Sequence, residues 1–136
     1  MDPVREQLLK NMGFSEKAIS ILDQNLNMGK PEDASVSAQH QGACGDILFL
    51  FLKINQDIIS EARFEYIGCA GLQVCASALT ELVKGLTLAK AGQLEARDII
   101  NYLESIPQRK YECAEISRDT LRKALAIWQQ PTLKVI

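Results

Sequence analysis

The side chains best suited to chemistry in this sequence are four cysteines, Cys44, Cys69, Cys75 and Cys113. Thiolates are nucleophiles, and they bind zinc ions and iron–sulfur clusters. The only histidine is His40, which excludes a catalytic scheme that needs several histidines. The cysteines therefore point to metal binding or thiol chemistry.

Three of these cysteines stand at the ends of expected secondary-structure elements. Cys44 lies in segment 42–46 (Gly-Ala-Cys-Gly-Asp), just before an apolar strand. Cys69 lies in segment 68–71 (Gly-Cys-Ala-Gly) between a strand and a helix, and Cys113 opens the last helix. Neighbouring glycines let a bulky inorganic ligand approach closely, and a helix N-terminus favours a thiolate over a thiol.

Asp46 adds a carboxylate two residues after Cys44, within reach of the same ion. Cys69 follows Cys44 by 25 residues and Cys113 follows Cys69 by 44, so the three do not form a zinc knuckle with paired Cys-x-x-Cys arms. Spacing alone leaves two interpretations open: the cysteines are metal ligands, or each is a small buried hydrophobic residue.

Length and charge limit the classes of function. A chain of 136 residues fits one compact domain. Its net charge of −2 argues against binding of nucleic acid through phosphate contacts. The longest apolar run, residues 47–52, is too short to span a bilayer, and the first residues do not read as a secretory signal. We therefore expect a protein of the cytoplasm, where disulfides are rare. We also expect it to bind neither nucleic acid nor membrane.

Capping residues and the spacing of apolar residues predict helices at both ends of the chain and strands between them. The expected helices cover residues 3–12, 16–26, 72–84, a short stretch after Thr87, 97–104 and 113–130. The expected strands cover residues 35–39, 47–54 and 61–66, and turn residues 55–57 join the last two as a hairpin.

This order of elements predicts an α+β fold, in which a small antiparallel sheet of about three strands is covered by helices. We expect a single domain over residues 1–136, with residues 1–14 as an N-terminal helical extension and residues 15–130 as its core. The side chains expected to pack in the hydrophobic interior include Phe49, Phe51, Ala62, Phe64, Cys75 and Trp128.

Three stretches of the chain resemble a known family. Segment 42–46, segment 61–69 (which runs from Glu-Ala-Arg-Phe to Gly-Cys) and segment 79–85 (Leu-Thr-Glu-Leu-Val-Lys-Gly) are similar to the iron–sulfur cluster assembly scaffold family of the IscU/NifU N-terminal type. The resemblance runs from about Ser15 through Trp128.

The resemblance implies a site for a metal or a cluster. In this family, the residues matching Cys44, Asp46, Cys69 and Cys113 hold a transient [2Fe–2S] cluster or a zinc ion in its place. It also implies a scaffold protein, not an enzyme, that receives sulfur as persulfide from a cysteine desulfurase and passes the cluster to acceptor apo-proteins. We expect Cys113 to accept the persulfide first, and the protein to be a monomer or a weak homodimer.

Two alternatives stand beside this interpretation. The first is a zinc-binding persulfide acceptor that serves the same desulfurase through the same ligands. The second is an interaction module that keeps the fold and binds no metal.

The chain departs from the family at several positions. Glu112 replaces the histidine that precedes the third cysteine in bacterial scaffolds. Its carboxylate is either a ligand of zinc or iron or, as we favour, a solvated glutamate at a helix start. Segment 106–110 matches the loop recognised by the dedicated Hsp70-type chaperone only at a proline and a lysine, so the resemblance does not extend to that partner. His40 is a secondary candidate ligand, and Lys84 and Lys110 either balance the charge of a thiolate site or are simply solvated.

Overall fold

The computed structural model describes residues 1–130, and a three-stranded antiparallel sheet lies at its centre. The strands are β1 (Val36–Gln41), β2 (Ile47–Asn55) and β3 (Ile58–Ile67). Each strand pairs with the next one along the chain, so the sheet is a meander in the order β1-β2-β3. The expected α+β fold with three antiparallel strands is confirmed.

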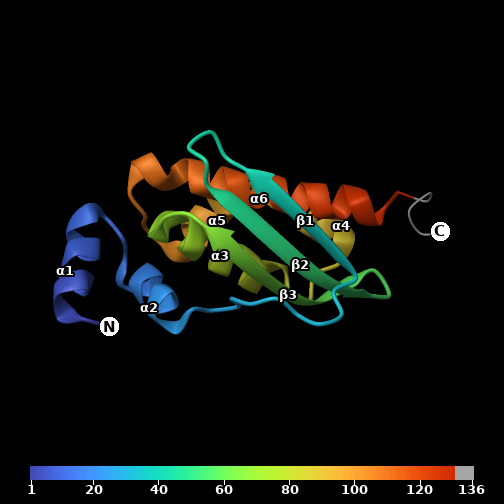
Figure 1. Ribbon diagram of the computed structural model, residues 1–136, viewed down its shortest axis with the longest axis horizontal. Coiled ribbons are helices and arrows are strands. Elements are labelled where there is room, and N and C mark those ends of the chain that lie inside the picture. Colours follow the sequence, from blue (N-terminus) through green and yellow to red (C-terminus); the bar gives the residue numbers. More distant parts are fainter. Residues whose placement is uncertain (131–136) are drawn as a thin grey trace.

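Helices cover one face of this sheet (Figure 1). The helices are α1 (Pro3–Met12), α2 (Glu16–Gln24), α3 (Ala70–Val83), α4 (Leu88–Ala91), α5 (Ala96–Leu103) and α6 (Tyr111–Trp128), with a 3-10 turn η1 (Gln108–Lys110). Helix α6 packs along β1 and β2, and α3 packs against β3. Helix α1 lies at one end of the molecule, beyond α2 (Figure 1).

The sheet buries the side chains that point toward the helices. Leu48, Leu50 and Leu52 of β2 and Ala62 and Phe64 of β3 have no exposed surface. They alternate with outward-facing residues because successive side chains of a strand point to opposite faces. Together with apolar residues of α2, α3, α5 and α6 they form one core, as expected for a single domain of this size.

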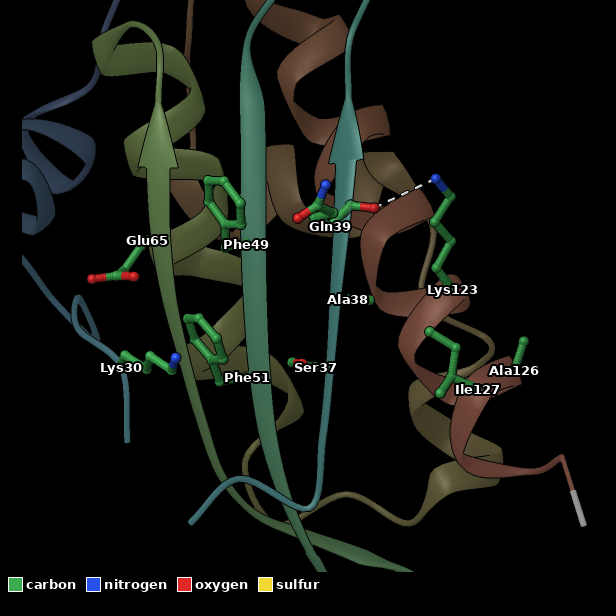
Figure 2. A pocket seen from close by; sticks show the side chains of 10 residues that line it. All are labelled: Lys30, Ser37, Ala38, Gln39, Phe49, Phe51, Glu65, Lys123, Ala126 and Ile127. Carbon is green, nitrogen blue, oxygen red and sulfur yellow. Dashed lines mark hydrogen bonds between the residues drawn. The ribbon is translucent and has the colours of Figure 1, made fainter. Parts of the chain in front are cut away.

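Phe49 and Phe51 lie outside that core cluster, although Phe51 is buried (8% exposed), as expected, and only Phe49 is half-buried. Both project from the face of the sheet that carries no helix, where they line an open groove with Lys30 and with Ile127 of α6 (Figure 2). The Lys30 ammonium lies 5.8 Å from the centre of the Phe51 ring. An apolar run with no alternation predicts a strand buried on both faces, and this strand is covered by helices on only one.

Several boundaries also differ from those expected. The first strand covers Val36–Gln41 instead of 35–39, and α2 ends at Gln24 because Asn25 adopts the left-handed conformation (φ 49°) that closes a helix. Helix α6 begins at Tyr111, so Cys113 lies inside its first turn and does not open it. The side chains of Asp2, Ser15 and Thr87 cap the N-termini of α1, α2 and α4.

The topology brings four chain segments to one end of the sheet: the β1–β2 turn, the end of β3, and the first turns of α3 and α6 (Figure 1). The Gly42 position shows how close the turn and α6 are, since a Cβ atom there would lie 2.5 Å from Ile116 Cδ1. Within residues 1–130, no helix is both long and apolar enough to cross a membrane.

Candidate metal centre

Three of the four expected ligands meet at this end of the sheet. One carboxylate oxygen of Asp46 and the sulfur atoms of Cys69 and Cys113 all lie within 4.8 Å of one another. They come from the β1–β2 turn, the start of α3 and the first turn of α6. Residues far apart in the sequence therefore converge on one small volume.

Cys69 is the N-cap residue of α3, and Cys113 is the third residue of α6. Both sulfur atoms thus lie near helix N-termini, where unpaired N–H groups and the helix dipole stabilise negative charge. Cys69 is half-buried, whereas only 2% of Cys113 is exposed. Cys113 is therefore covered by the protein and lies in a helix, not on an accessible loop.

Two glycines bring Asp46 to the cysteines. Gly45 has a φ of +88°, a left-handed conformation that glycine adopts without strain, and the Gly42 N–H closes the turn on the Asp46 carbonyl at 2.8 Å. Gly68 leaves space for the carboxylate, because a Cβ atom there would lie 2.9 Å from Asp46 Cγ. The Asp46 Oδ2 atom lies 3.9 Å from Cys69 Sγ.

The thiols of Cys69 and Cys113 differ in acidity. A hydrogen bond with Cys113, a backbone hydrogen bond with Leu72 and the nearby Lys110 ammonium together lower the pKa of Cys69 to about 5, against the opposing effect of burial. The same hydrogen bond to Cys69 and then burial raise the pKa of Cys113. Without metal, Cys69 is therefore the first of the pair to ionise, and Cys113 keeps its proton and shares it with the Cys69 sulfur.

Lys110 supplies a positive charge to this site. Its Nζ lies 3.4 Å from Cys69 Sγ. Its aliphatic part passes over Gly71, where a Cβ atom would lie 2.9 Å from Lys110 Cδ. Lys84 does not take part, since it pairs instead with Asn27 and Glu81. Both lysines are candidates from the sequence for balancing the charge of the site. Only the fold shows that Lys110, and not Lys84, approaches a thiol.

Cys44 does not join the group of Asp46, Cys69 and Cys113. It is exposed, and its thiol donates a long hydrogen bond to the Glu112 carboxylate, with 3.8 Å between Sγ and Oε1. Glu112 precedes Cys113 in the first turn of α6, so Cys44 lies beside the group. The sequence left Glu112 as either a metal ligand or a solvated residue and did not predict its contact with Cys44.

The remaining candidates lie elsewhere. Cys75 of α3 has no exposed surface and packs in the core as expected, and burial raises the pKa of its thiol. His40 of β1 is paired with Leu48 and is not part of the metal-binding group. Its Nδ1 atom is buried without a hydrogen-bond partner within residues 1–130.

The donor set is chemically suited to a thiophilic metal. Thiolate ligands select zinc and iron–sulfur clusters, and carboxylate oxygen is a common additional ligand for zinc. Asp46, Cys69 and Cys113 supply three donors. Cys44, two residues before Asp46 in the sequence, is a further thiol close to them along the chain. Lys110 offsets part of the negative charge that such a set collects.

Comparisons with known proteins identify the family of this chain. Residues 13–134 match the NifU-like N terminal domain family. The chain is 35% identical over 120 residues to the iron-sulfur cluster assembly scaffold protein IscU of Escherichia coli K12, and the match covers 85% of this chain and 93% of that protein. It is 39% identical over 121 residues to the nitrogen fixation protein NifU of a Nostoc species, and it spans 40% of the length of that longer protein.

Solved structures share the fold. A putative iron-sulfur cluster assembly scaffold protein for the SUF system from Fervidobacterium islandicum superposes with a TM-score of 0.68 at 22% identity, over 82% of this chain and 96% of that one. A NifU-like N-terminal protein from Brucella abortus gives a TM-score of 0.67 at 17% identity, over 86% of this chain and 94% of that one.

Proposed function

This chain belongs to the NifU-like N-terminal domain family, and we propose from its site that it is a scaffold for iron–sulfur cluster assembly. The observation that carries the proposal is the convergence of Asp46, Cys69 and Cys113, whose ligand atoms lie within 4.8 Å of one another. Its E. coli relative is named as such a scaffold. On this proposal the chain is a carrier and not an enzyme that turns over a substrate.

The cargo is iron and a transient [2Fe–2S] cluster, held by Cys44, Asp46, Cys69 and Cys113. Cys69 and Cys113 are the inner thiol ligands, since both lie in the converged group. Cys44 completes the set from the exposed β1–β2 turn. A cysteine desulfurase is the sulfur source, and acceptor apo-proteins receive the finished cluster, in the cytoplasm.

A mixed donor set suits a site that must release what it binds. Four thiolates hold iron–sulfur clusters durably in electron-transfer proteins. A carboxylate is a hard oxygen donor and a poorer partner for iron bound to sulfide. Asp46 is therefore the ligand that makes the cluster labile, while the thiolates provide the affinity.

A second candidate function uses the same residues. Zinc accepts cysteine sulfur and carboxylate oxygen together, which is the donor combination found here. A resident zinc ion would then orient the thiols of a persulfide acceptor, and sulfur alone would be passed on. This alternative predicts tightly held zinc and no cluster.

Cluster transfer tests the proposal and separates it from the zinc alternative. The protein is reconstituted anaerobically with ferrous iron and sulfide, freed of small molecules, and mixed with an apo-ferredoxin that accepts a [2Fe–2S] cluster. We expect the ferredoxin spectrum to appear, even in the presence of a chelator that removes free iron. Cys69→Ser should abolish transfer, whereas Cys75→Ser, a change in the core, should not. Zinc retained through reconstitution, with no visible absorbance and no transfer, would support the alternative instead.

A further inference from the structure

We propose that two copies of this chain associate weakly and reversibly through the open face of the sheet, related by a twofold axis. The open face is formed by Phe49 and Phe51 of β2, by Ser37 and Gln39 of β1 and by Glu65 of β3 (Figure 2). It is distinct from the metal centre, whose residues lie at the end of the sheet. Dimer formation and cluster binding are therefore separate properties.

Strand β2 carries apolar side chains on both of its faces. Leu48, Leu50 and Leu52 point into the core, whereas Phe49 and Phe51 point to the face that no helix covers within residues 1–130. Apolar residues on both faces are typical of a strand that is covered on both. A single copy therefore leaves one apolar face of β2 for a second layer.

A groove of about 800 Å³ runs over this face. Phe49 is half-buried in it, Phe51 is buried beside Lys30, and Ile127 of α6 is 37% exposed along its side. Apolar side chains at the centre and charged ones around them are the usual composition of a protein–protein interface. The groove thus offers room for apolar side chains of another protein surface.

The charges around the groove favour a second copy as that surface. Lys30, Glu65 and Lys123 are exposed and form no ion pair within residues 1–130. Further along the same face, by contrast, Lys53 is paired with Glu61. A surface that carries unpaired charges of both signs is complementary to another surface of mixed charge, and its own copy is such a surface.

Twofold symmetry pairs these charges. Glu65 lies on the β3 side of the open face, as does Lys30, which follows the segment that pairs with Phe64; Lys123 lies on the α6 side, beyond β1 (Figure 2). A twofold axis along the strands places β3 of one copy over β1 of the other, so Glu65 meets Lys123 of the second copy. An axis across the strands places β3 over β3, so Glu65 meets Lys30 instead. In either case the same ion pair forms twice, as an isologous interface requires.

The area of the open face limits the strength of the dimer. Strand β1 is 6 residues long, and three such strands cover roughly 300 Å² on each copy. Two copies therefore bury about half of the roughly 1,200 Å² at which stable interfaces begin. We expect a reversible dimer with a dissociation constant above about 1 µM.

Sedimentation velocity of the full chain tests the proposal. The metal-free protein is kept reduced and measured from about 1 µM to about 1 mM, the range expected for so small an interface. We expect the average mass to rise from that of a monomer toward that of a dimer. Phe49→Ser should weaken association about ten-fold, whereas Leu8→Ser, which changes an apolar side chain that is 57% exposed on α1, should not. A monomer at every concentration, or a dimer that Phe49→Ser leaves unchanged, would overturn the proposal.

Charge reversal tests the symmetry without disturbing the core, because the three charged side chains are exposed. Glu65→Lys and Lys123→Glu should each weaken self-association several-fold, and an equimolar mixture of the two should form a heterodimer in which both ion pairs are restored. With the axis across the strands, Lys30→Glu replaces Lys123→Glu in that rescue. Failure of both mixtures to associate better than the single variants would refute the twofold contact.

Two further variants assign the contact elsewhere if the proposal is wrong. Cys69→Ser should dimerise like the unaltered chain, and loss of the dimer in it would place the contact at the metal centre. A chain with Leu133→Ser and Val135→Ser should also dimerise like the unaltered chain. Dimers that form only in this double variant would show that the segment after α6 fills the groove, and would likewise overturn the proposal.

Discussion

Asp46 is the carboxylate that lies beside the two inner thiols, Cys69 and Cys113, and on the proposed function it sets how long the site holds its cargo. Because a hard oxygen bonds weakly to iron in a sulfide cluster, we expect Asp46→Ala to lengthen the lifetime of the reconstituted cluster about two- to ten-fold. The measurement is the anaerobic decay of visible absorbance in the presence of a chelator. Asp119→Ala, which removes a surface carboxylate paired with Arg118, is the control. Faster decay in Asp46→Ala than in the unaltered chain would contradict this role.

Cys75 provides a second prediction at the residue scale. Its side chain has no exposed surface, so Cys75→Ala leaves a small cavity and should lower the free energy of unfolding by about 1 kcal/mol. Urea denaturation measures this change. The zinc stoichiometry of the variant should equal that of the unaltered chain. A loss of bound zinc equal to that of Cys69→Ala would instead make Cys75 part of the site.

The sequence predicts the role of some site residues but not the contacts or burial of others. The glycines next to Cys44 and Cys69 indicated a ligand site from the sequence alone, because a missing side chain beside a thiol leaves room for a bulky inorganic group. The contact between Cys44 and Glu112 was not predictable, since it joins residues 68 positions apart through packing of the β1–β2 turn on α6. The burial of Cys113 was missed for a related reason: helix α6 begins two residues earlier than expected.

At the scale of elements, the site depends on how closely the β1–β2 turn approaches α6. A Cβ atom at Gly42 would lie 2.5 Å from Ile116 Cδ1, and Ile116 is 9% exposed and has little room to move. We expect Gly42→Ala to lower the free energy of unfolding by about 1–3 kcal/mol and to weaken zinc binding, because Asp46 follows on the same turn.

A double-mutant cycle isolates this contact. Ile116→Val removes the Cδ1 atom and alone should cost about 0.5–1.5 kcal/mol. In the Ile116→Val background, Gly42→Ala should cost clearly less than it does in the unaltered chain, as measured by urea unfolding. Strict additivity of the two changes would show that the turn and helix do not meet as described.

The sequence predicted which elements form but not which faces they bury. The run from Ile47 to Leu52 identified a strand, and the charged alternation in β3 identified its partner. Continuous apolarity carries no information about which face meets the helices, so it does not predict that Phe49 and Phe51 line the groove on the other face, where Phe51 is nonetheless buried (Figure 2). Capping residues fixed helix starts well, because their side-chain hydrogen bonds are local.

At the scale of the molecule, the proposed metal site predicts that folding of the meander and its helical layer is coupled to metal binding. The ligands come from the β1–β2 turn, α3 and α6, so a metal that joins them links the sheet to both helices. Zinc at about one hundred times its dissociation constant should raise the free energy of unfolding by about 2.7 kcal/mol. Thermal unfolding with and without zinc measures this shift. In Cys69→Ser the shift should largely vanish, and an equal shift there would place the zinc elsewhere.

The central claim is that thiols from distant segments form one cluster site at the end of the sheet. Its most direct test is iron and acid-labile sulfide analysis of the anaerobically reconstituted chain, with Cys69→Ser and Cys75→Ser in parallel. The account predicts equal amounts of iron and sulfide in the unaltered chain and in Cys75→Ser, and almost none in Cys69→Ser. Iron without sulfide, or the same content in all three proteins, would contradict it.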